Sequence, residues 1–89
     1  MTSVTTERFR KCYKNLPDHI KESASKAYSL WKENPQHRSL QFKLLHKTQP
    51  IYSVRINLAW RALGVKQKNT MIWFWIGSHA EYDKLIESL

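Results

Sequence analysis

The hydropathy pattern of this 89-residue chain predicts an α+β fold in a single domain, residues 1–89. The first third has apolar residues at helical spacing, the middle alternates apolar and polar side chains, and the last apolar run leads into a helix-capping motif. Together these observations predict two N-terminal helices packed on a small curved antiparallel sheet of three to four strands, with a C-terminal helix.

Apolar side chains in the first third of the chain recur every three or four residues, as in amphipathic helices. The first helix is expected over about residues 5–15, with a stripe of Phe9, Cys12, Tyr13 and Leu16. Pro17 breaks it, and Asp18 can cap the second helix because its carboxylate accepts hydrogen bonds from free N–H groups. The second helix ends before Pro35, and its stripe consists of Ile20, Ala24, Ala27, Tyr28 and Trp31.

The middle of the chain has the period of half-buried strands. Two strands are expected around residues 40–44 and 52–56, with a turn between them. A third strand is expected over residues 59–66 and a fourth over residues 71–76. The fourth is apolar on both faces, which predicts a central strand buried on both sides. The short turns between the strands predict antiparallel neighbours.

A last helix is predicted by Ser78 and Glu81, which fit the S-x-x-E capping box directly after the fourth strand. The apolar face of this helix consists of Tyr82, Leu85, Ile86 and Leu89. We expect the helices to cover one face of the sheet and to leave the other face open.

The charge balance narrows the range of partners. The chain has 15 Lys+Arg and 7 Asp+Glu, a net charge of +8, which attracts RNA, DNA, an acidic protein or anionic lipid. A basic protein with no nucleic-acid role has the same composition. No apolar run is long enough to span a membrane, and residues 1–7 lack the features of a signal peptide. With a single cysteine and no intramolecular disulfide, these features predict a cytoplasmic protein.

Strand alternation predicts where three of the basic side chains point. If Val54 faces the helices, then Lys43, Arg55 and Arg61 share the opposite face of the sheet. Arginine on a rigid strand suits phosphate because its planar fork binds two oxygens. The alternative is that these charges only solvate an outer face, and a one-residue slip in register would reverse the prediction.

A histidine, a phenol and a carboxylate gather after the last strand. His79 and Asp83 lie four residues apart on the predicted helix and therefore share one side of it, with Tyr82 beside them. RNA cleavage requires a base, an acid and cations, and these residues with Arg55 and Arg61 can supply them. The alternative is an ordinary helix start, in which Tyr82 belongs to the core and Asp83 favours the helix dipole. The four histidines have no paired spacing, so no metal site is predicted.

The tryptophans of the strands leave a second question open. Trp60, Trp73 and Trp75 lie close to arginines in the predicted sheet, and some of them must be buried. An exposed indole could stack on nucleic-acid bases, or it could receive a helix from a partner protein, which we favour.

Three runs of this sequence, Tyr52–Ile56, Trp60–Leu63 and Trp73–Asp83, together resemble the RelE/ParE toxin superfamily. The His-x-x-Tyr-Asp ending is most similar to HigB-like and related ParE-like toxins. The resemblance covers most of the chain and implies a small basic toxin of a type II toxin–antitoxin module, with helices on a curved antiparallel sheet. It also implies a small acidic antitoxin as partner.

The resemblance implies roles for particular residues. In RelE-like members, basic residues of the sheet bind the scissile phosphate of mRNA in the ribosomal A site. Arg61 resembles the arginine of the family's Tyr-Arg strand, and Arg55 resembles the arginine one strand earlier, with Lys43 and Lys66 as looser matches for phosphate binding. His79, Tyr82 and Asp83 match the HigB-like ending. The implied activity is that of a metal-independent endoribonuclease without a cofactor, in which Asp83 orients His79 and Tyr82 shapes the site.

Two features depart from the family pattern. A helix is expected over about residues 5–15, where the family has an N-terminal edge strand. The arginine that RelE carries near its last strand is replaced by Glu81 or Tyr82. Two alternatives therefore stay open: a ParE-like inhibitor of DNA gyrase that cuts no RNA, and a non-toxic homologue that binds nucleic acid or protein.

Overall fold

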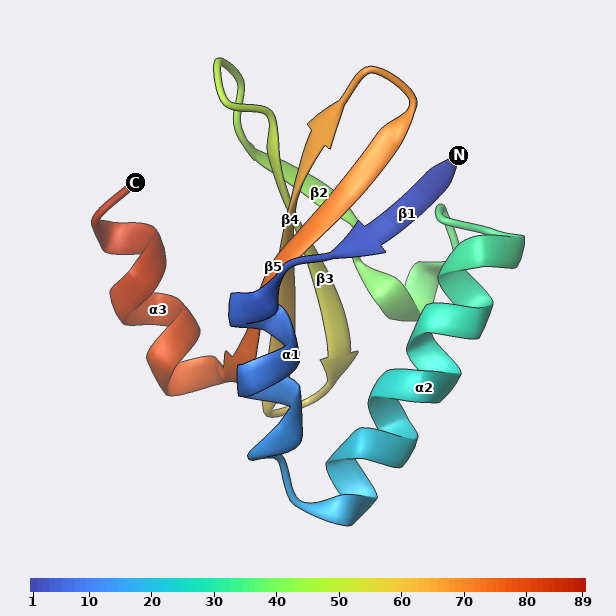
Figure 1. The fold of residues 1–89 in the computed structure, drawn as a ribbon, viewed down its shortest axis with the longest axis vertical. Helices are drawn as coiled ribbons and strands as arrows, with labels where there is room; N and C mark the ends of the chain where they lie inside the picture. The colour runs from blue at the N-terminus through green and yellow to red at the C-terminus, as the bar shows by residue number, and fades with distance from the viewer.

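The computed structural model describes all 89 residues and confirms the α+β class. Helices lie on both sides of one five-stranded sheet (Figure 1). In chain order the elements are β1 (Thr2–Thr5), α1 (Glu7–Lys14), α2 (Asp18–Glu33), the 3-10 turn η1 (Arg38–Leu40), β2 (Lys43–His46), β3 (Ile51–Asn57), β4 (Trp60–Gln67), β5 (Thr70–Ser78) and α3 (His79–Glu87).

The sheet has one more strand than expected, and one of its pairs is parallel. The strand order is β1-β5-β4-β3-β2, in which β1 runs parallel to β5 and the other pairs are antiparallel. The expectation that a helix replaces the N-terminal edge strand is wrong. Residues 2–5 are rich in β-branched side chains, which favour a strand, and the free edge of β5 supplies their hydrogen-bond partners. Thr6 then caps α1 by accepting a hydrogen bond from the Phe9 amide at 3.1 Å.

The two N-terminal helices pack on one face of the sheet, which we call the α2 face. The predicted stripe of α2 is buried except for Tyr28, which is 41% exposed. It meets a core of strand residues that includes Val54, Ala62, Trp73 and Ile76. Two aromatic rings contact Trp31 edge to face, Phe42 at 5.9 Å and Trp73 at 5.2 Å between ring centroids.

The first antiparallel strand begins later than expected. Leu40 lies in η1 and is buried, and Gln41 has a φ of 44°, which turns the chain before β2 begins at Lys43. The alternation of Leu40 and Phe42 therefore does not mark a strand. Phe42 still packs against the core of the α2 face.

The central strand β5 is buried on both sides because it contains a β-bulge. Trp73 and Trp75 are two residues apart and would share one face of a regular strand. Leu63 pairs with Trp75 and its neighbour Gly64 pairs with Trp73, so Phe74 is an extra residue. The bulge sends Trp73 to the α2 face and Trp75 to the opposite face, where they are 5% and 7% exposed. Both indoles are therefore closed to bases and to a partner helix, and the partner interpretation is wrong for them.

The C-terminal helix covers the opposite face, so the prediction that all helices lie on one side is also wrong. Figure 1 shows α3 and α2 on opposite sides of the sheet. Tyr82 of α3 packs in a second, smaller core with Ile51, Leu63 and Trp75. We call this the α3 face. No helix is long and apolar enough to cross a membrane.

Candidate functional site

Two arginines stand side by side on the α3 face. Arg55 of β3 pairs with Arg61 of β4, and Arg61 pairs in turn with Gly77 of β5. Directly opposed residues of neighbouring strands point to the same face of a sheet. Because Gly77 has no side chain, the Trp75 ring and the Glu81 carboxylate lie close over it, on the side of the arginine pair where α3 begins.

The two lysines expected at the site are placed differently. Lys43 pairs with Ser53, so it points to the α3 face and is a diagonal neighbour of Arg55. Lys66 pairs with Met71, which belongs to the core of the α2 face. The structure therefore brings Lys43 to the arginines and leaves Lys66 on the other side of the sheet.

The start of α3 is fixed beside the arginine pair. The Ser78 hydroxyl accepts a hydrogen bond from the Glu81 amide at 3.2 Å, and Glu81 accepts one from the Ser78 amide at 3.2 Å. This is the capping box expected from the sequence. The His79 amide donates to the carbonyl of Ala59 at 2.7 Å, which ties the first residue of α3 to the turn between β3 and β4.

The imidazole of His79 contacts the carboxylate of Asp83, and the two form an ion pair when the imidazole is protonated. Nδ1 of His79 lies 3.1 Å from Oδ2 of Asp83, and the two side chains are 45% and 55% exposed. The carboxylate therefore holds one ring nitrogen and leaves Nε2 without a partner in the protein. The Tyr82 ring lies 5.7 Å from the imidazole, and Tyr82 is 5% exposed, so it supports the histidine from the core.

The guanidinium of Arg61 is bound on one side only. Its Nη1 donates to the carbonyls of Asn57 at 2.7 Å and Trp60 at 3.0 Å, with a longer contact to Leu58 at 3.5 Å. Nη2 and Nε have no partner in the protein. One amine of the fork is therefore fixed to the backbone, while the others are available to an anion.

Charged and polar groups of β3 and α3 change the pKa of Arg61. Burial and the neighbouring charge of Arg55 lower the pKa of Arg61, whereas Tyr82 and Asp83 raise it. No carboxylate lies within ion-pair distance of either arginine, because the ion pairs of the protein are Lys11–Glu7 and His79–Asp83. Two adjacent cations without an anionic partner repel each other, and a bound phosphate would relieve that repulsion.

The arrangement has the parts for general acid–base chemistry on a phosphodiester. Two cations lie on rigid strands, and an imidazole with one free nitrogen lies on the helix that starts beside them. Sequence reasoning found these residues and expected a short turn between β3 and β4, but it did not foresee that this turn contacts both groups. The asparagine at the start of that turn was the available signal. No group of three or more His, Cys, Asp and Glu side chains is placed to hold a metal ion.

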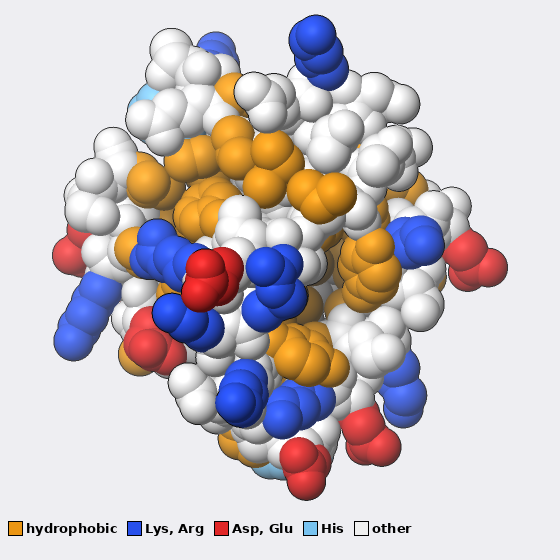
Figure 2. Space-filling model, in the orientation of Figure 1, with side chains coloured by type: hydrophobic (Ala, Val, Ile, Leu, Met, Phe, Trp, Pro, Cys, Tyr) orange, Lys and Arg blue, Asp and Glu red, His pale blue; other side chains and the backbone are white.

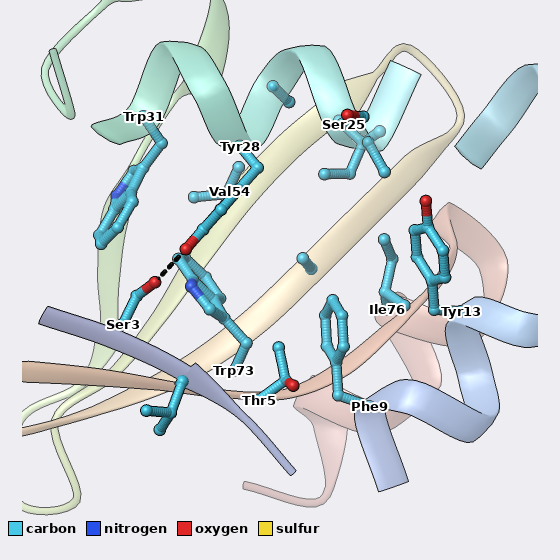
Figure 3. Close-up of a pocket in the computed structure, with 15 residues that line it drawn as sticks. Ser3, Thr5, Phe9, Tyr13, Ser25, Tyr28, Trp31, Val54, Trp73 and Ile76 are labelled. Atoms are coloured by element: carbon cyan, nitrogen blue, oxygen red, sulfur yellow. Dashed lines mark hydrogen bonds between the residues drawn. The ribbon is translucent and has the colours of Figure 1, made fainter. Parts of the chain in front are cut away.

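Other surface features lie away from this site. Figure 2 shows basic side chains gathered over α1, the helix that contributes Arg8, Arg10, Lys11 and Lys14. On the α2 face, a mostly apolar cavity of about 410 Å³ lies between α1, α2, β1 and the sheet (Figure 3). A hydrogen bond between Ser3 and Tyr28 joins β1 to α2 at this cavity.

Comparisons with known proteins agree with this fold. A family model described as the ParE-like toxin domain matches residues 18–84. No curated protein matches the chain.

Three solved structures illustrate the likeness. The chain is similar to a RelB–RelE antitoxin–toxin complex from Methanococcus jannaschii, with 14% identity, a TM-score of 0.73 and coverage of 92% of this chain and 96% of that one. YafQ from E. coli strain BL21(DE3) gives 12% identity, a TM-score of 0.72 and coverage of 90% and 94%. The isolated E. coli RelE toxin gives 15% identity, a TM-score of 0.66 and coverage of 99% and 98%.

Two of these structures are described as RelE toxins, and all three likenesses extend over nearly the full length of each chain. The family model covers three quarters of the sequence, from the start of α2 into α3. The chain therefore belongs to the ParE-like toxin family, within the RelE/ParE toxin superfamily.

Proposed function

We propose that this protein is the toxin of a type II toxin–antitoxin module and acts as a ribosome-dependent, metal-independent endoribonuclease. One observation carries the proposal: two arginines without carboxylate partners lie beside the His79–Asp83 pair at the start of α3. The resemblance of Arg55, Arg61 and the His-x-x-Tyr-Asp ending to RelE-like and HigB-like toxins supports the same roles.

In this mechanism the 2′-hydroxyl of the mRNA attacks the adjacent phosphorus, and the bond from phosphorus to the 5′-oxygen breaks. The attacking hydroxyl loses a proton to a base, and the leaving 5′-oxygen receives one from an acid. Arg55 and the free amines of Arg61 bind the non-bridging oxygens, where negative charge accumulates. Lys43 binds the same strand of RNA as a diagonal neighbour of Arg55.

His79 carries one of the two proton transfers through Nε2, as acid or as base. Asp83 holds Nδ1 and thereby fixes the orientation of the ring. Tyr82 supports the ring from the core. Lys66 takes no part, because it lies on the α2 face.

The partners follow from the family and the charge. A relative was solved as an antitoxin–toxin complex, which supports an antitoxin for this chain. The net charge of +8 suits a small acidic antitoxin and also the RNA of the ribosome. We place this activity in the cytoplasm, where the ribosome and mRNA are found.

The test is primer extension on a reporter mRNA after induced expression of the wild type, His79→Ala and Arg55→Ala. New in-frame cuts that both substitutions remove would support the proposal. Cuts that survive both substitutions would keep a nuclease and discard this site.

A second candidate is inhibition of DNA gyrase, because the matching family model is the ParE-like one. This function requires no proton transfer. It therefore predicts growth arrest with DNA-damage signalling, an intact reporter mRNA and no effect of His79→Ala. A non-toxic binding homologue would leave both growth and the mRNA unchanged.

A further inference from the structure

The turn between β3 and β4 lies between the two halves of the site. β3 ends at Asn57 and β4 begins at Trp60, so only Leu58 and Ala59 form the turn. Two-residue hairpin turns usually place glycine or asparagine at positive φ. Neither turn residue does so here, since the only residues with positive φ are Gln41 and Lys68. Another interaction must therefore hold this turn.

The side chain of Asn57 supplies that interaction. Its Oδ1 accepts a hydrogen bond from the Ala59 amide at 2.9 Å, which is an Asx turn. The strand pairing is irregular between Arg55 and Asn57, so the regular ladder does not by itself fix the turn. Asn57 therefore sets the path of the chain through residues 57–59.

Two carbonyls of this short path hold the two functional groups. The Asn57 carbonyl accepts from Nη1 of Arg61 at 2.7 Å. The Ala59 carbonyl accepts from the backbone amide of His79 at 2.7 Å. One side chain thus fixes the acceptor for the phosphate-binding cation and the acceptor for the first residue of α3.

We propose that Asn57 is a positioning residue that holds the Arg61 guanidinium and the His79 end of α3 in register through its Asx turn. The proposal rests on the proposed function for its effect on catalysis, while the positioning itself is measurable without any activity. A misplacement of about 1 Å between reacting groups can lower a rate by about a hundredfold. The side chain of the partly exposed Asn57 contacts neither group and acts on both through the backbone carbonyls of residues 57 and 59.

The test compares three variants of the purified protein. Asn57→Ala removes the acceptor, Asn57→Asp keeps it, and Asn69→Ala makes the same change in the turn between β4 and β5, at the other end of the sheet. The readouts are hydrogen exchange of the His79 amide, the NMR signals of the Arg61 guanidinium, and cleavage of the reporter mRNA.

We expect Asn57→Ala to speed exchange of the His79 amide by about tenfold, the effect of losing one hydrogen bond. The Arg61 guanidinium signals should move toward those of a free arginine, and cleavage should fall by about a hundredfold. Asn57→Asp should restore all three readouts, and Asn69→Ala should leave them at wild-type values. Rescue by aspartate separates a lost acceptor from a general loosening of the fold.

Unchanged exchange and guanidinium signals in Asn57→Ala would overturn the proposal. So would an Asn57→Asp variant as defective as Asn57→Ala, or faster exchange with unchanged cleavage. If the wild type cuts no RNA, the proposed function fails, and the exchange and guanidinium signals alone decide whether Asn57 holds both groups.

Discussion

The two faces of the sheet differ in size and in chemistry. The α2 face buries a cluster of eleven residues, from Leu16 to Ile76, and every one of them is apolar. The α3 face buries a cluster of four, Ile51, Leu63, Trp75 and Tyr82, and beyond it lie Arg55, Arg61 and the His79–Asp83 pair. The larger core buries more apolar side chains and should therefore contribute more to stability, whereas the smaller one underlies the candidate site.

This difference predicts that substitutions on the two faces affect different properties, stability on one and activity on the other. On the α2 face, a change should alter stability and affect activity only through loss of folded protein. On the α3 face, a change at Arg55 or Arg61 should alter activity with little cost in stability, because both side chains are partly exposed.

The largest effect is expected for Trp31→Ala. Trp31 is 2% exposed and contacts both Phe42 and Trp73, so the substitution leaves a large cavity. We expect a loss of about 3–5 kcal/mol in the free energy of unfolding, measured by urea denaturation. Leu58→Ala, at a residue that is 78% exposed, is the control and should change stability by less than about 0.5 kcal/mol. A loss below about 1 kcal/mol for Trp31→Ala would show that the α2 face is not the main core.

A matched pair of glycines compares the two faces directly. A Cβ on Gly64 would lie 2.7 Å from the Trp73 ring, and a Cβ on Gly77 would lie 2.5 Å from the Trp75 ring. Both alanine variants should lose about 1–3 kcal/mol by overpacking, measured by urea denaturation. Only Gly77→Ala should also reduce reporter cleavage at a temperature where both variants are folded, because Gly77 pairs with Arg61 and precedes α3. Equal cleavage by the two variants would contradict the prediction that only the α3 face supports activity.

The sequence predicted most of the α2 face, because its signals are local. The stripe of α2 follows the helical period and the apolar run of β5 is continuous, and a short window of sequence contains both signals. Two things depended on contacts distant in sequence. Residues 2–5 became a strand because β5 offers a free edge, and α3 crossed to the other face because the bulge at Phe74 redirects Trp75 toward it. Neither cause is visible in a local window.

The site was predictable where strand parity governs it and not where a turn does. Alternation placed Lys43, Arg55 and Arg61 on one face, and the observed register agrees. Lys66 was grouped with them through a looser resemblance, and its pairing with Met71 puts it on the other face. The β3–β4 turn positions Arg61 and His79 through hydrogen bonds to its backbone carbonyls. These contacts form only in the folded protein, and no spacing in the sequence predicts them.

Asp83→Asn tests whether the ion pair of α3 serves function more than stability. The pair lies on an exposed helix surface, so its loss should cost no more than about 0.5 kcal/mol in urea denaturation. Cleavage should fall by about a hundredfold, as when a proton-transfer group loses its orientation. Lys11→Ala removes the other exposed i,i+4 ion pair, with Glu7, and should cost as little stability without changing cleavage. Wild-type cleavage by Asp83→Asn would remove Asp83 from the mechanism.

The smallest effect on stability, and one of opposite sign, is expected for Arg55→Gln. Arg55 lowers the pKa of Arg61, so the two charges repel each other in the folded state. Removing one charge should raise the free energy of unfolding by a few tenths of a kcal/mol, and high salt should abolish the gain. Arginine side chains stay protonated around neutral pH, so the gain should be constant between about pH 6 and pH 8. Lys43→Gln is the control: Lys43 pairs with Ser53 and not with an arginine, so this substitution should leave stability unchanged. A variant that becomes less stable while losing cleavage would mean that Arg55 supports the fold, whereas a more stable and inactive one would show that the α3 face keeps its two cations for binding phosphate.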